Sequence, residues 1–259
     1  MHVYAHRGAS IEKPENTLAA FARSLELGAE GIELDVVVSK DGQLMVLHDL
    51  TLDRTTNATG PASDFTAAEL RQVDAGGGEY VPTLTEVFTL CEQKVRINVE
   101  IKDPTAVDSL VALVVQHPNL DWFATSSHWD ALENLRAALP DAEVMPLTVG
   151  APENVERHLE WARERYTPDE LELWLEQRRR QTFQNAITWA NGNGAIGISI
   201  FHENISAEII GQIHDAGLEA WVWTVNDPGR AMEVTAMGAD AICTDDPAAV
   251  LAARSALTS

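Results

Sequence analysis

The sequence predicts an α/β protein with a (β/α)8 TIM-barrel fold, and three observations predict it. Eight short runs rich in β-branched residues alternate with amphipathic stretches of helical period. Eight parallel strands close such a barrel, and 259 residues is a typical length for one. The open doubly wound sheet is disfavoured because no GxGxxG pattern follows the first strand. We therefore expect one barrel domain over residues 1–259.

The predicted strands are short and the helical patterns fall between them. The strands are expected at His2–His6, Gly31–Ser39, Val95–Lys102, Trp122–Ser126, Ala142–Leu147, Ala195–Ile200, Glu219–Val225 and Ala241–Thr244. Several helical patterns begin with Asn, Thr, Ser or Asp and end near Gly, as helix caps do. They cover Thr17–Leu27, Leu84–Gln93, Ala106–His117, Trp129–Ala138, Ser206–Ala216 and Pro228–Met237.

A small β-hairpin insertion is expected after strand 2. The stretch Lys40–Gln43 (Lys-Asp-Gly-Gln) is a hairpin signal, and Leu44–His48 is typical of the returning strand. If Asp41-Gly42 forms a two-residue turn, Asp35 pairs with His48. Because paired residues share a face of the sheet, this register brings His48 to the side of Asp35.

A helical insertion is expected after strand 5, over about residues 151–192, because Ala151–Gly192 is longer than one helix needs. Apolar side chains in or next to it suit the inner faces of two helices: Trp161, Leu171, Trp174, Leu175 and Phe183. Since barrels build active sites where their strands end, the insertion is placed to overhang the site. Extra scaffold or a dimer contact is the plainer alternative, which leaves a homo-oligomer open.

Charge and composition exclude several classes of protein. The 40 acidic and 18 basic residues give a net charge of -22, which repels nucleic acid. A hydrophobic content of 45% excludes wholesale disorder. An anionic protein of this kind binds a small phosphate ester only where local cations or a metal ion reverse the field.

The sequence also predicts the cellular compartment of the protein. Cys91 and Cys243 lie far apart in apolar segments and are expected to be buried thiols rather than a disulfide. The first strand begins at His2, which leaves no room for a signal peptide, and apolar stretches such as Leu110–Val115 are too short to span a bilayer. We therefore expect a cytoplasmic protein without a transmembrane segment.

Two carboxylates share one face of the second strand. In Gly31–Val38, alternation puts Glu33 and Asp35 on one side and apolar residues on the other. Parallel barrel strands are buried on both faces, so these carboxylates lie at the barrel's centre or mouth. Burying two like charges is costly without a cation, which Arg, Lys or a metal ion must supply.

The third strand repeats the pattern, with polar residues at alternate positions that include Glu100 and Lys102. Taken alone, it would fit a half-solvated antiparallel strand. Beside the second strand it instead predicts a cluster of three carboxylates from Glu33, Asp35 and Glu100. Mg²⁺ and Ca²⁺ prefer such oxygen ligands, whereas Zn²⁺ more often recruits His or Cys.

Two histidines are candidates for acid and base. His6 and Arg7 end the first strand, where a barrel builds its site, and the hairpin register returns His48 to the carboxylates. A His-Arg pair by itself is usually structural. Next to a metal site, however, two imidazoles with an ordinary pKa near 6.5 suit general acid and base catalysis. Trp223, at the end of the seventh strand, suits an apolar wall for a small substrate.

A series of short motifs runs in order along the chain: His6-Arg7-Gly8, Pro14-Glu15-Asn16-Thr17, Glu33-Leu34-Asp35, Lys40-Asp41-Gly42, His48-Asp49, Arg54-Thr55-Thr56, Glu100-Ile101-Lys102, Trp223-Thr224-Val225-Asn226 and Thr244-Asp245-Asp246-Pro247. This set resembles the glycerophosphodiester phosphodiesterase family over nearly the whole chain. The similarity is weakest over Trp122–Gly194, where the long insertion departs from the family pattern.

The resemblance implies a metal-dependent TIM-barrel enzyme that hydrolyses glycerophosphodiesters to sn-glycerol 3-phosphate and an alcohol. It implies one divalent cation, Mg²⁺ or Ca²⁺, and a small-molecule glycerophosphodiester as the substrate. It also implies that the glycerol 2-hydroxyl attacks phosphorus first and that water then opens the cyclic phosphate.

The resemblance also assigns roles to single residues. It implies that Glu33, Asp35 and Glu100 hold the metal ion and that His6 and His48 are the general acid and base. Arg7 and Lys102 contact the phosphate, and Glu15 helps to position the site. Trp223 is assigned from its place at the strand's end instead, where it suits an apolar wall for the glycerol carbons. Two alternatives stay open: a lysophospholipase D-type phosphodiesterase with an apolar lid, and a non-catalytic sugar-phosphate-binding barrel.

Overall fold

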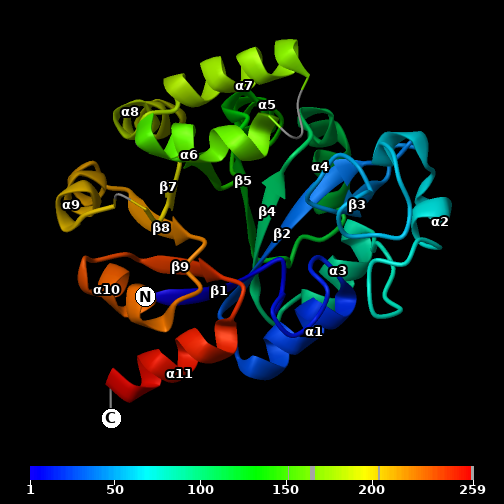
Figure 1. The fold of residues 1–259 in the computed structure, drawn as a ribbon, viewed down its shortest axis with the longest axis horizontal. Coiled ribbons are helices and arrows are strands. Elements are labelled where there is room, and N and C mark those ends of the chain that lie inside the picture. The colour runs from blue at the N-terminus through cyan, green and yellow to red at the C-terminus, as the bar shows by residue number, and fades with distance from the viewer. Residues whose placement is uncertain (151, 164–166, 204, 258–259) are drawn as a thin grey trace.

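Eight parallel strands close a barrel in the computed structural model, which describes residues 1–150, 152–163, 167–203 and 205–257 (Figure 1). β1 pairs with β2 on one side and with β9 on the other, which completes the ring. The barrel strands are β1 (His2–His6), β2 (Gly31–Val38), β4 (Arg96–Ile101), β5 (Trp122–Ser126), β6 (Val144–Thr148), β7 (Gly197–Phe201), β8 (Glu219–Trp223) and β9 (Ala241–Thr244). The predicted barrel is confirmed, and each predicted strand agrees with an observed one to within two residues at each end.

Helices cover the outside of the barrel. They are α1 (Leu18–Leu27), α2 (Ala67–Leu70), α3 (Leu84–Cys91), α4 (Val107–Val114), α5 (Trp129–Ala138), α8 (Phe183–Asn193), α9 (Ala207–Asp215), α10 (Pro228–Ala236) and α11 (Pro247–Leu257), with short 3-10 turns at Ala62–Asp64 and Pro104–Ala106. All six predicted helices are present; α2 and α11 are additions to them, and α8 falls largely within the predicted insertion. None of the described helices is long and apolar enough to cross a bilayer.

The core has an outer and an inner part. Outer apolar side chains fill the space between the strands and the helices. Inside the barrel, the Trp221 ring lies 4.4 Å from that of Tyr4 and 4.8 Å from that of Phe123, and Cys243 packs with them. Tyr4 and Trp221 each lie two residues before the end of their strand, so this aromatic cluster sits below the mouth. Cys91 and Cys243 are both buried free thiols, as predicted.

The hairpin strand β3 (Leu44–Val46) is present, but its predicted register is wrong by one residue. Val38 pairs with Leu44, and Ser39 N donates to Gln43 O, so the loop holds three residues rather than two. Gly42 takes a left-handed φ of 79°, the conformation that such three-residue hairpin loops use. Asp35 is consequently opposite Leu47, not His48, and His48 lies beyond the end of β3.

The helical insertion follows β6, the fifth strand of the barrel, as predicted. Its helices α6 (Pro152–Arg163) and α7 (Pro168–Arg180) cross one end of the barrel (Figure 1). Trp174 is buried between them in an apolar cluster that also includes Phe201 and Trp223 from the barrel mouth. The Trp161 side chain lies outside the described residues. The side chain of Gln177 donates to Ser127 O at 3.0 Å, which ties α7 to the loop after β5.

Candidate active site

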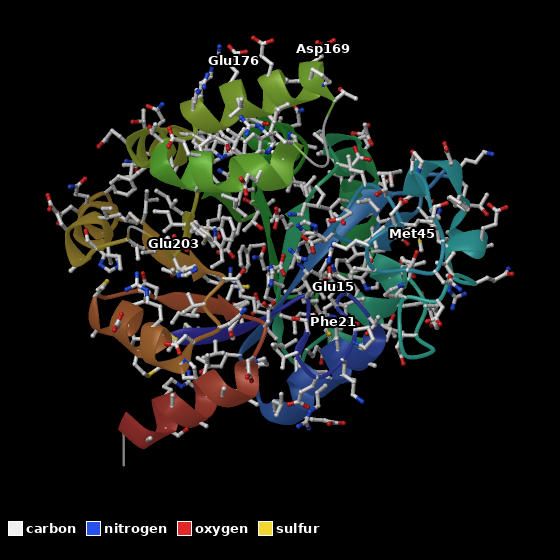
Figure 2. The ribbon with its side chains drawn as sticks, viewed as in Figure 1. Glu15, Phe21, Met45, Asp169, Glu176 and Glu203 are labelled. Carbon is white, nitrogen blue, oxygen red and sulfur yellow. The ribbon has the colours of Figure 1, made fainter. Side chains whose placement is uncertain are left out.

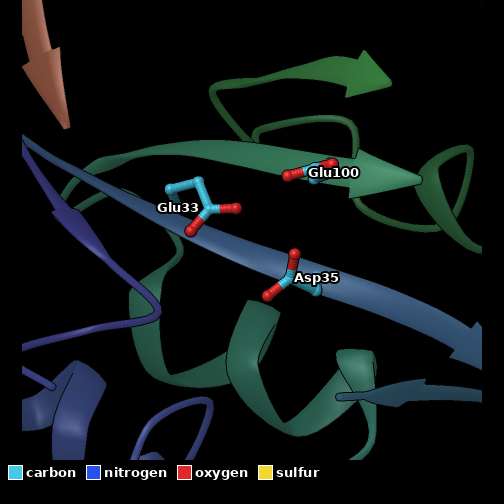
Figure 3. Close-up of side chains that lie close together, drawn as sticks. All are labelled: Glu33, Asp35 and Glu100. Atoms are coloured by element: carbon cyan, nitrogen blue, oxygen red, sulfur yellow. The ribbon is translucent and has the colours of Figure 1, made fainter. Parts of the chain in front are cut away.

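Three carboxylates meet inside the barrel. Glu33 and Asp35 are two residues apart on β2 and share a face, and the parallel register sets Asp35 beside Glu100 of β4. One oxygen from each of the three lies within 4.8 Å of the others (Figure 3). All three residues are buried, with exposures of 3%, 0% and 6%. The structure therefore brings together the three residues that the sequence selected.

This cluster has the chemistry of a divalent-cation site. Glu33 Oε1 and Asp35 Oδ1 are buried and accept no hydrogen bond. Burial, and then the negative charges of Asp35 and Glu100, raise the pKa of Glu33 well above its usual range. Three carboxylates that lie close together, with oxygens that accept no hydrogen bond, suit Mg²⁺ or Ca²⁺, which prefer oxygen ligands. A cation bound there would offset the repulsion between the carboxylates that raises the pKa of Glu33.

Two side-chain cations adjoin the carboxylates. Lys102 Nζ lies 2.7 Å from Glu100 Oε1 and 3.4 Å from Asp35 Oδ1, and Arg7 Nε lies 3.3 Å from Asp35 Oδ2. Burial would raise the pKa of Asp35, but the positive charges around it, that of Lys102 foremost, lower it below its usual range. The adjoining cations therefore favour the ionised form of Asp35, whereas burial and the neighbouring carboxylates disfavour that of Glu33.

The His6-Arg7-Gly8 turn is shaped by close packing against α1. A Cβ on Gly8 would lie 2.6 Å from the Ala20 side chain, and Gly8 has a left-handed φ of 83°. Only glycine fits such a position without strain. Arg7 also takes a positive φ, of 56°, and its backbone N donates to Glu33 Oε2 at 2.9 Å. The turn thus fixes the first strand's end against the acidic cluster.

His6 is held by a carboxylate that we did not include among the predicted site residues. Its Nδ1 lies 2.6 Å from Asp245 Oδ1, and its Nε2 lies 4.0 Å from Glu33 Oε2. Ser10 and Asn226 donate to the two oxygens of Asp245 at 3.0 and 2.6 Å. Although burial opposes it, these bonds, led by that of His6, lower the pKa of Asp245 to about 2. Asp245 therefore orients the imidazole so that Nε2 faces the cluster.

His48 has a matching arrangement. Its Nδ1 lies 2.5 Å from Asp49 Oδ1, and Arg54 Nε donates to Asp49 Oδ2 at 2.7 Å. Burial and then the positive charge of Lys102 lower the pKa of His48, which favours the neutral imidazole. His48 thus approaches the cluster although the predicted strand register is wrong, because the chain after β3 carries it there.

Glu15 lies between two arginines at the edge of the site. Arg7 NH1 donates to its Oε1 at 3.0 Å, and Arg54 donates to both of its oxygens at 2.8 and 2.9 Å. Glu15 therefore positions Arg7. Asn16, the next residue, donates to Asp35 Oδ2 at 2.8 Å.

Our sequence-based assignment of site residues omitted Asp245, Asp49, Arg54 and Asn16. Each of these four residues lies within a motif that carries the family resemblance. Their presence in those motifs is the sequence signal that could have identified them. Their roles depend on partners as far apart as His6 and Asp245, which no spacing along the chain reveals.

Trp223 links the barrel interior with the helical insertion. Its ring lies 5.3 Å from that of Phe201, and it packs both on the interior aromatic cluster and on the insertion's cluster around Trp174. Trp223 is half-buried at the end of β8, so it forms an apolar wall at the barrel mouth.

Comparisons with known proteins identify the same family. The model of the glycerophosphoryl diester phosphodiesterase family matches residues 6–249. A glycerophosphodiester phosphodiesterase of Caldanaerobacter subterraneus subsp. tengcongensis is 33% identical over 95% of this chain and 94% of its own length. The structure of an Oleispira antarctica phosphodiesterase in complex with the product sn-glycerol 3-phosphate superposes with a TM-score of 0.80 at 26% identity, over 98% of this chain and 97% of that one.

A second solved structure agrees. The glycerophosphodiester phosphodiesterase of Agrobacterium tumefaciens str. C58 has a TM-score of 0.74 and is 28% identical, over 97% of this chain and 99% of that one. These matches confirm the resemblance seen in the motifs, and with it the assignment as an enzyme. The chain belongs to the glycerophosphoryl diester phosphodiesterase family.

Proposed function

We propose that this protein hydrolyses glycerophosphodiesters to sn-glycerol 3-phosphate and an alcohol, with one Mg²⁺ or Ca²⁺ ion held by Glu33, Asp35 and Glu100. The observation that carries the proposal is the convergence of these buried carboxylates within 4.8 Å. The product named in the Oleispira antarctica structure supports the choice of substrate class.

The charge balance explains why a cation is needed. When ionised, the three carboxylates outnumber the two adjoining cations, Arg7 and Lys102, so the site alone repels a phosphodiester. A divalent cation held by Glu33, Asp35 and Glu100 would reverse that sign and would draw charge from the phosphoryl oxygens. Arg7 and Lys102 then bind the phosphate and stabilise the negative charge that develops during the reaction.

The two histidines divide the proton transfers. Each imidazole has its Nδ1 against a carboxylate, which leaves Nε2 for the substrate. One imidazole takes the proton of the glycerol 2-hydroxyl as that oxygen attacks phosphorus, and the other protonates the departing alkoxide. Water then opens the cyclic phosphate with the two roles reversed. Because the glycerol 2-hydroxyl is already tethered to the phosphate, the entropic barrier of its attack on phosphorus is low. Trp223 borders the glycerol carbons.

The test is release of sn-glycerol 3-phosphate from glycerophosphoethanolamine by protein freed of metal with EDTA and then titrated with Mg²⁺ or Ca²⁺. We expect activity that depends on the added ion and is lost in Glu33→Gln with the circular dichroism spectrum unchanged. Asp108→Asn, which removes an exposed carboxylate on α4, is the matched control and should remain active. Equal activity in EDTA would refute the metal site.

Two further outcomes separate the alternatives. A non-catalytic barrel would bind the diester but would not hydrolyse it, so no sn-glycerol 3-phosphate would be released. A substrate analogue that lacks the glycerol 2-hydroxyl should resist hydrolysis, and its hydrolysis at the normal rate would exclude the cyclic phosphate.

A further inference from the structure

Another histidine lies at the mouth of the barrel, and the proposed reaction does not use it. His128 comes two residues after the end of β5 and begins α5. Its backbone N donates to Ser126 Oγ at 2.9 Å, and that hydroxyl donates to Ile101 O at 2.7 Å. These bonds hold His128 beside the end of β4, where Glu100 and Lys102 lie.

The helical insertion holds the His128 side chain in place. Gln177 of α7 donates through Nε2 to Ser127 O at 3.0 Å, and the same Nε2 lies 3.4 Å from His128 Nδ1. Figure 2 shows Asp169 and Glu176 projecting from the outer side of α7. Gln177 instead reaches the loop after β5, so the insertion contacts both the backbone and the ring of this loop.

The contact with Gln177 decides which ring nitrogen of His128 carries the proton. A carbonyl oxygen only accepts hydrogen bonds, so the group that contacts Ser127 O is the amide NH2 of Gln177. The same NH2 faces His128 Nδ1, which therefore accepts, and the proton of the neutral ring lies on Nε2. Burial, and then the positive charge of Arg178, lower the pKa of His128, which favours the neutral ring.

We propose that His128 determines which alcohol the enzyme releases. Its Nε2–H donates a hydrogen bond to a hydroxyl of the departing alcohol, which favours a polyol such as glycerol over an amino alcohol or a simple alkyl alcohol. Gln177 is the positioning residue that sets the tautomer. The inference rests on the proposed function and names the specificity of that site for its leaving group.

The strand order sets His128 across the barrel from the proposed glycerol site. Trp223, which borders the glycerol, ends β8, whereas β5 lies three strands away and β4 four strands away around the barrel. The attacking and leaving oxygens of a phosphoryl transfer lie on opposite sides of phosphorus. With the glycerol beside Trp223, the departing alcohol extends toward the ends of β4 and β5. The charges of Lys102 and Glu100 both affect the pKa of His128, as expected for an imidazole near the site.

The chemistry of the donor selects the alcohol. A hydroxyl oxygen on the departing alcohol can accept the hydrogen bond from Nε2, whereas an ammonium or methyl group offers no lone pair. When no acceptor is present, the N–H group gives up its bond to water without replacement, which costs free energy. The favoured substrates are therefore glycerophosphodiesters whose second alcohol is itself a polyol.

The experiment uses two glycerophosphodiesters that differ by one hydroxyl, the ester of propane-1,3-diol and the ester of propan-1-ol, with the metal-loaded protein. The measurement is kcat/KM for release of sn-glycerol 3-phosphate. We expect the diol ester to be preferred about fivefold, which is the typical contribution of one hydrogen bond between neutral groups.

His128→Phe keeps a ring but removes the donor. It should lower kcat/KM for the diol ester to the value for the propanol ester, which should itself be unchanged. His128→Gln returns an N–H donor near the place of Nε2 and should restore most of the preference. His2→Phe is the matched control, because His2 starts β1 at the opposite end of the barrel and its side chain is 68% exposed. Its preference should equal that of the unmodified protein.

The tautomer of His128 can be measured directly. NMR of the ring nitrogens distinguishes a protonated Nε2 from a protonated Nδ1, and we expect His128 to carry its proton on Nε2. In Gln177→Leu we expect a mixture of the two tautomers and a smaller preference for the diol ester, with kcat/KM for the propanol ester unchanged. A proton on Nδ1 of His128 in the unmodified protein would overturn the proposal.

The outcomes separate this inference from the function on which it rests. If the unmodified protein hydrolyses both esters equally well, or if His128→Phe keeps the preference, His128 does not bind the departing alcohol and the proposed function stands. If neither ester is hydrolysed with metal present, the proposed function itself fails, and this inference fails with it.

Discussion

His6 Nδ1 lies 2.6 Å from Asp245 Oδ1, although the two residues come from opposite ends of the chain. β1 and β9 are neighbours in the barrel, and closure of the barrel brings these two strand ends together. The carboxylate fixes the ring's orientation and leaves Nε2 facing the three carboxylates, 4.0 Å from Glu33 Oε2.

Replacing Asp245 should reduce catalysis more than binding. Asp245→Asn keeps the shape of the side chain but no longer stabilises a charged imidazole, so we expect kcat to fall by about 10² with KM changed far less. Asp246→Asn is a close control, because Asp246 caps α11 by accepting from Ala249 N and has no contact with His6. Equal kcat values in the two variants would show that Asp245 does not position the histidine.

Asp245 should also contribute to stability in acid. Its pKa falls to about 2 in the folded protein from an ordinary 3.8, which corresponds to about 2 kcal/mol of folding free energy. A lowered pKa stabilises the fold above the unfolded-state value, so this contribution is present above pH 4 and is lost as the pH falls toward 2. Urea unfolding should therefore show a difference between the unmodified protein and Asp245→Asn at pH 5 that narrows at pH 3. A difference that is constant with pH would argue against this linkage.

Arg54 joins the two sides of the site through a planar fork. It contacts both oxygens of Glu15 and both oxygens of Asp49, at 2.7 to 3.2 Å. Lysine keeps the charge but cannot make these paired contacts. Through Asp49 and Glu15, Arg54→Lys should disturb both His48 and Arg7, so we expect kcat to fall about tenfold and KM to rise.

A second arginine provides the control for Arg54. Arg23 of α1 also bridges two carboxylates, those of Glu12 and Glu26, but on the protein surface. Arg23→Lys should leave kcat and KM unchanged, since surface ion pairs contribute little. Steady-state kinetics of both variants distinguish a general effect of losing a guanidinium from a specific one.

Metal binding should raise the melting temperature. The proposed ion would be held by carboxylates that repel one another in its absence, and only the folded site would bind it, so an ion at 100 times its Kd would add about 2.7 kcal/mol. Thermal unfolding with Mg²⁺ or Ca²⁺ against EDTA should show a shift of several degrees. The shift should largely disappear in Glu100→Gln, and a shift retained there would place the ion elsewhere.

Cys91 should not react in the folded protein. It is fully buried at the end of α3, and burial raises the pKa of its thiol to about 12. The thiolate is the reactive form, so at pH 8 a disulfide reagent such as 5,5′-dithiobis(2-nitrobenzoate) should label neither Cys91 nor Cys243 until denaturant is added. Rapid labelling of the native protein would contradict this packing.

The sequence alone determined the barrel and the acidic cluster. Alternation along β2 put Glu33 and Asp35 on one face of the sheet, and alternation along β4 put Glu100 on that face as well. These placements could be predicted because the two-residue period of a strand is a local property of the sequence. Strand and helix positions followed from the same local patterns, and the motif order identified the family.

Tertiary structure decided what local patterns cannot encode. The hairpin register depends on whether the loop holds two residues or three, and Gly42 at its third position shifted it by one. His6 and Asp245 lie at the ends of β1 and β9, and Arg54 and Glu15 come from separate loops, so the tertiary structure had to bring each pair together.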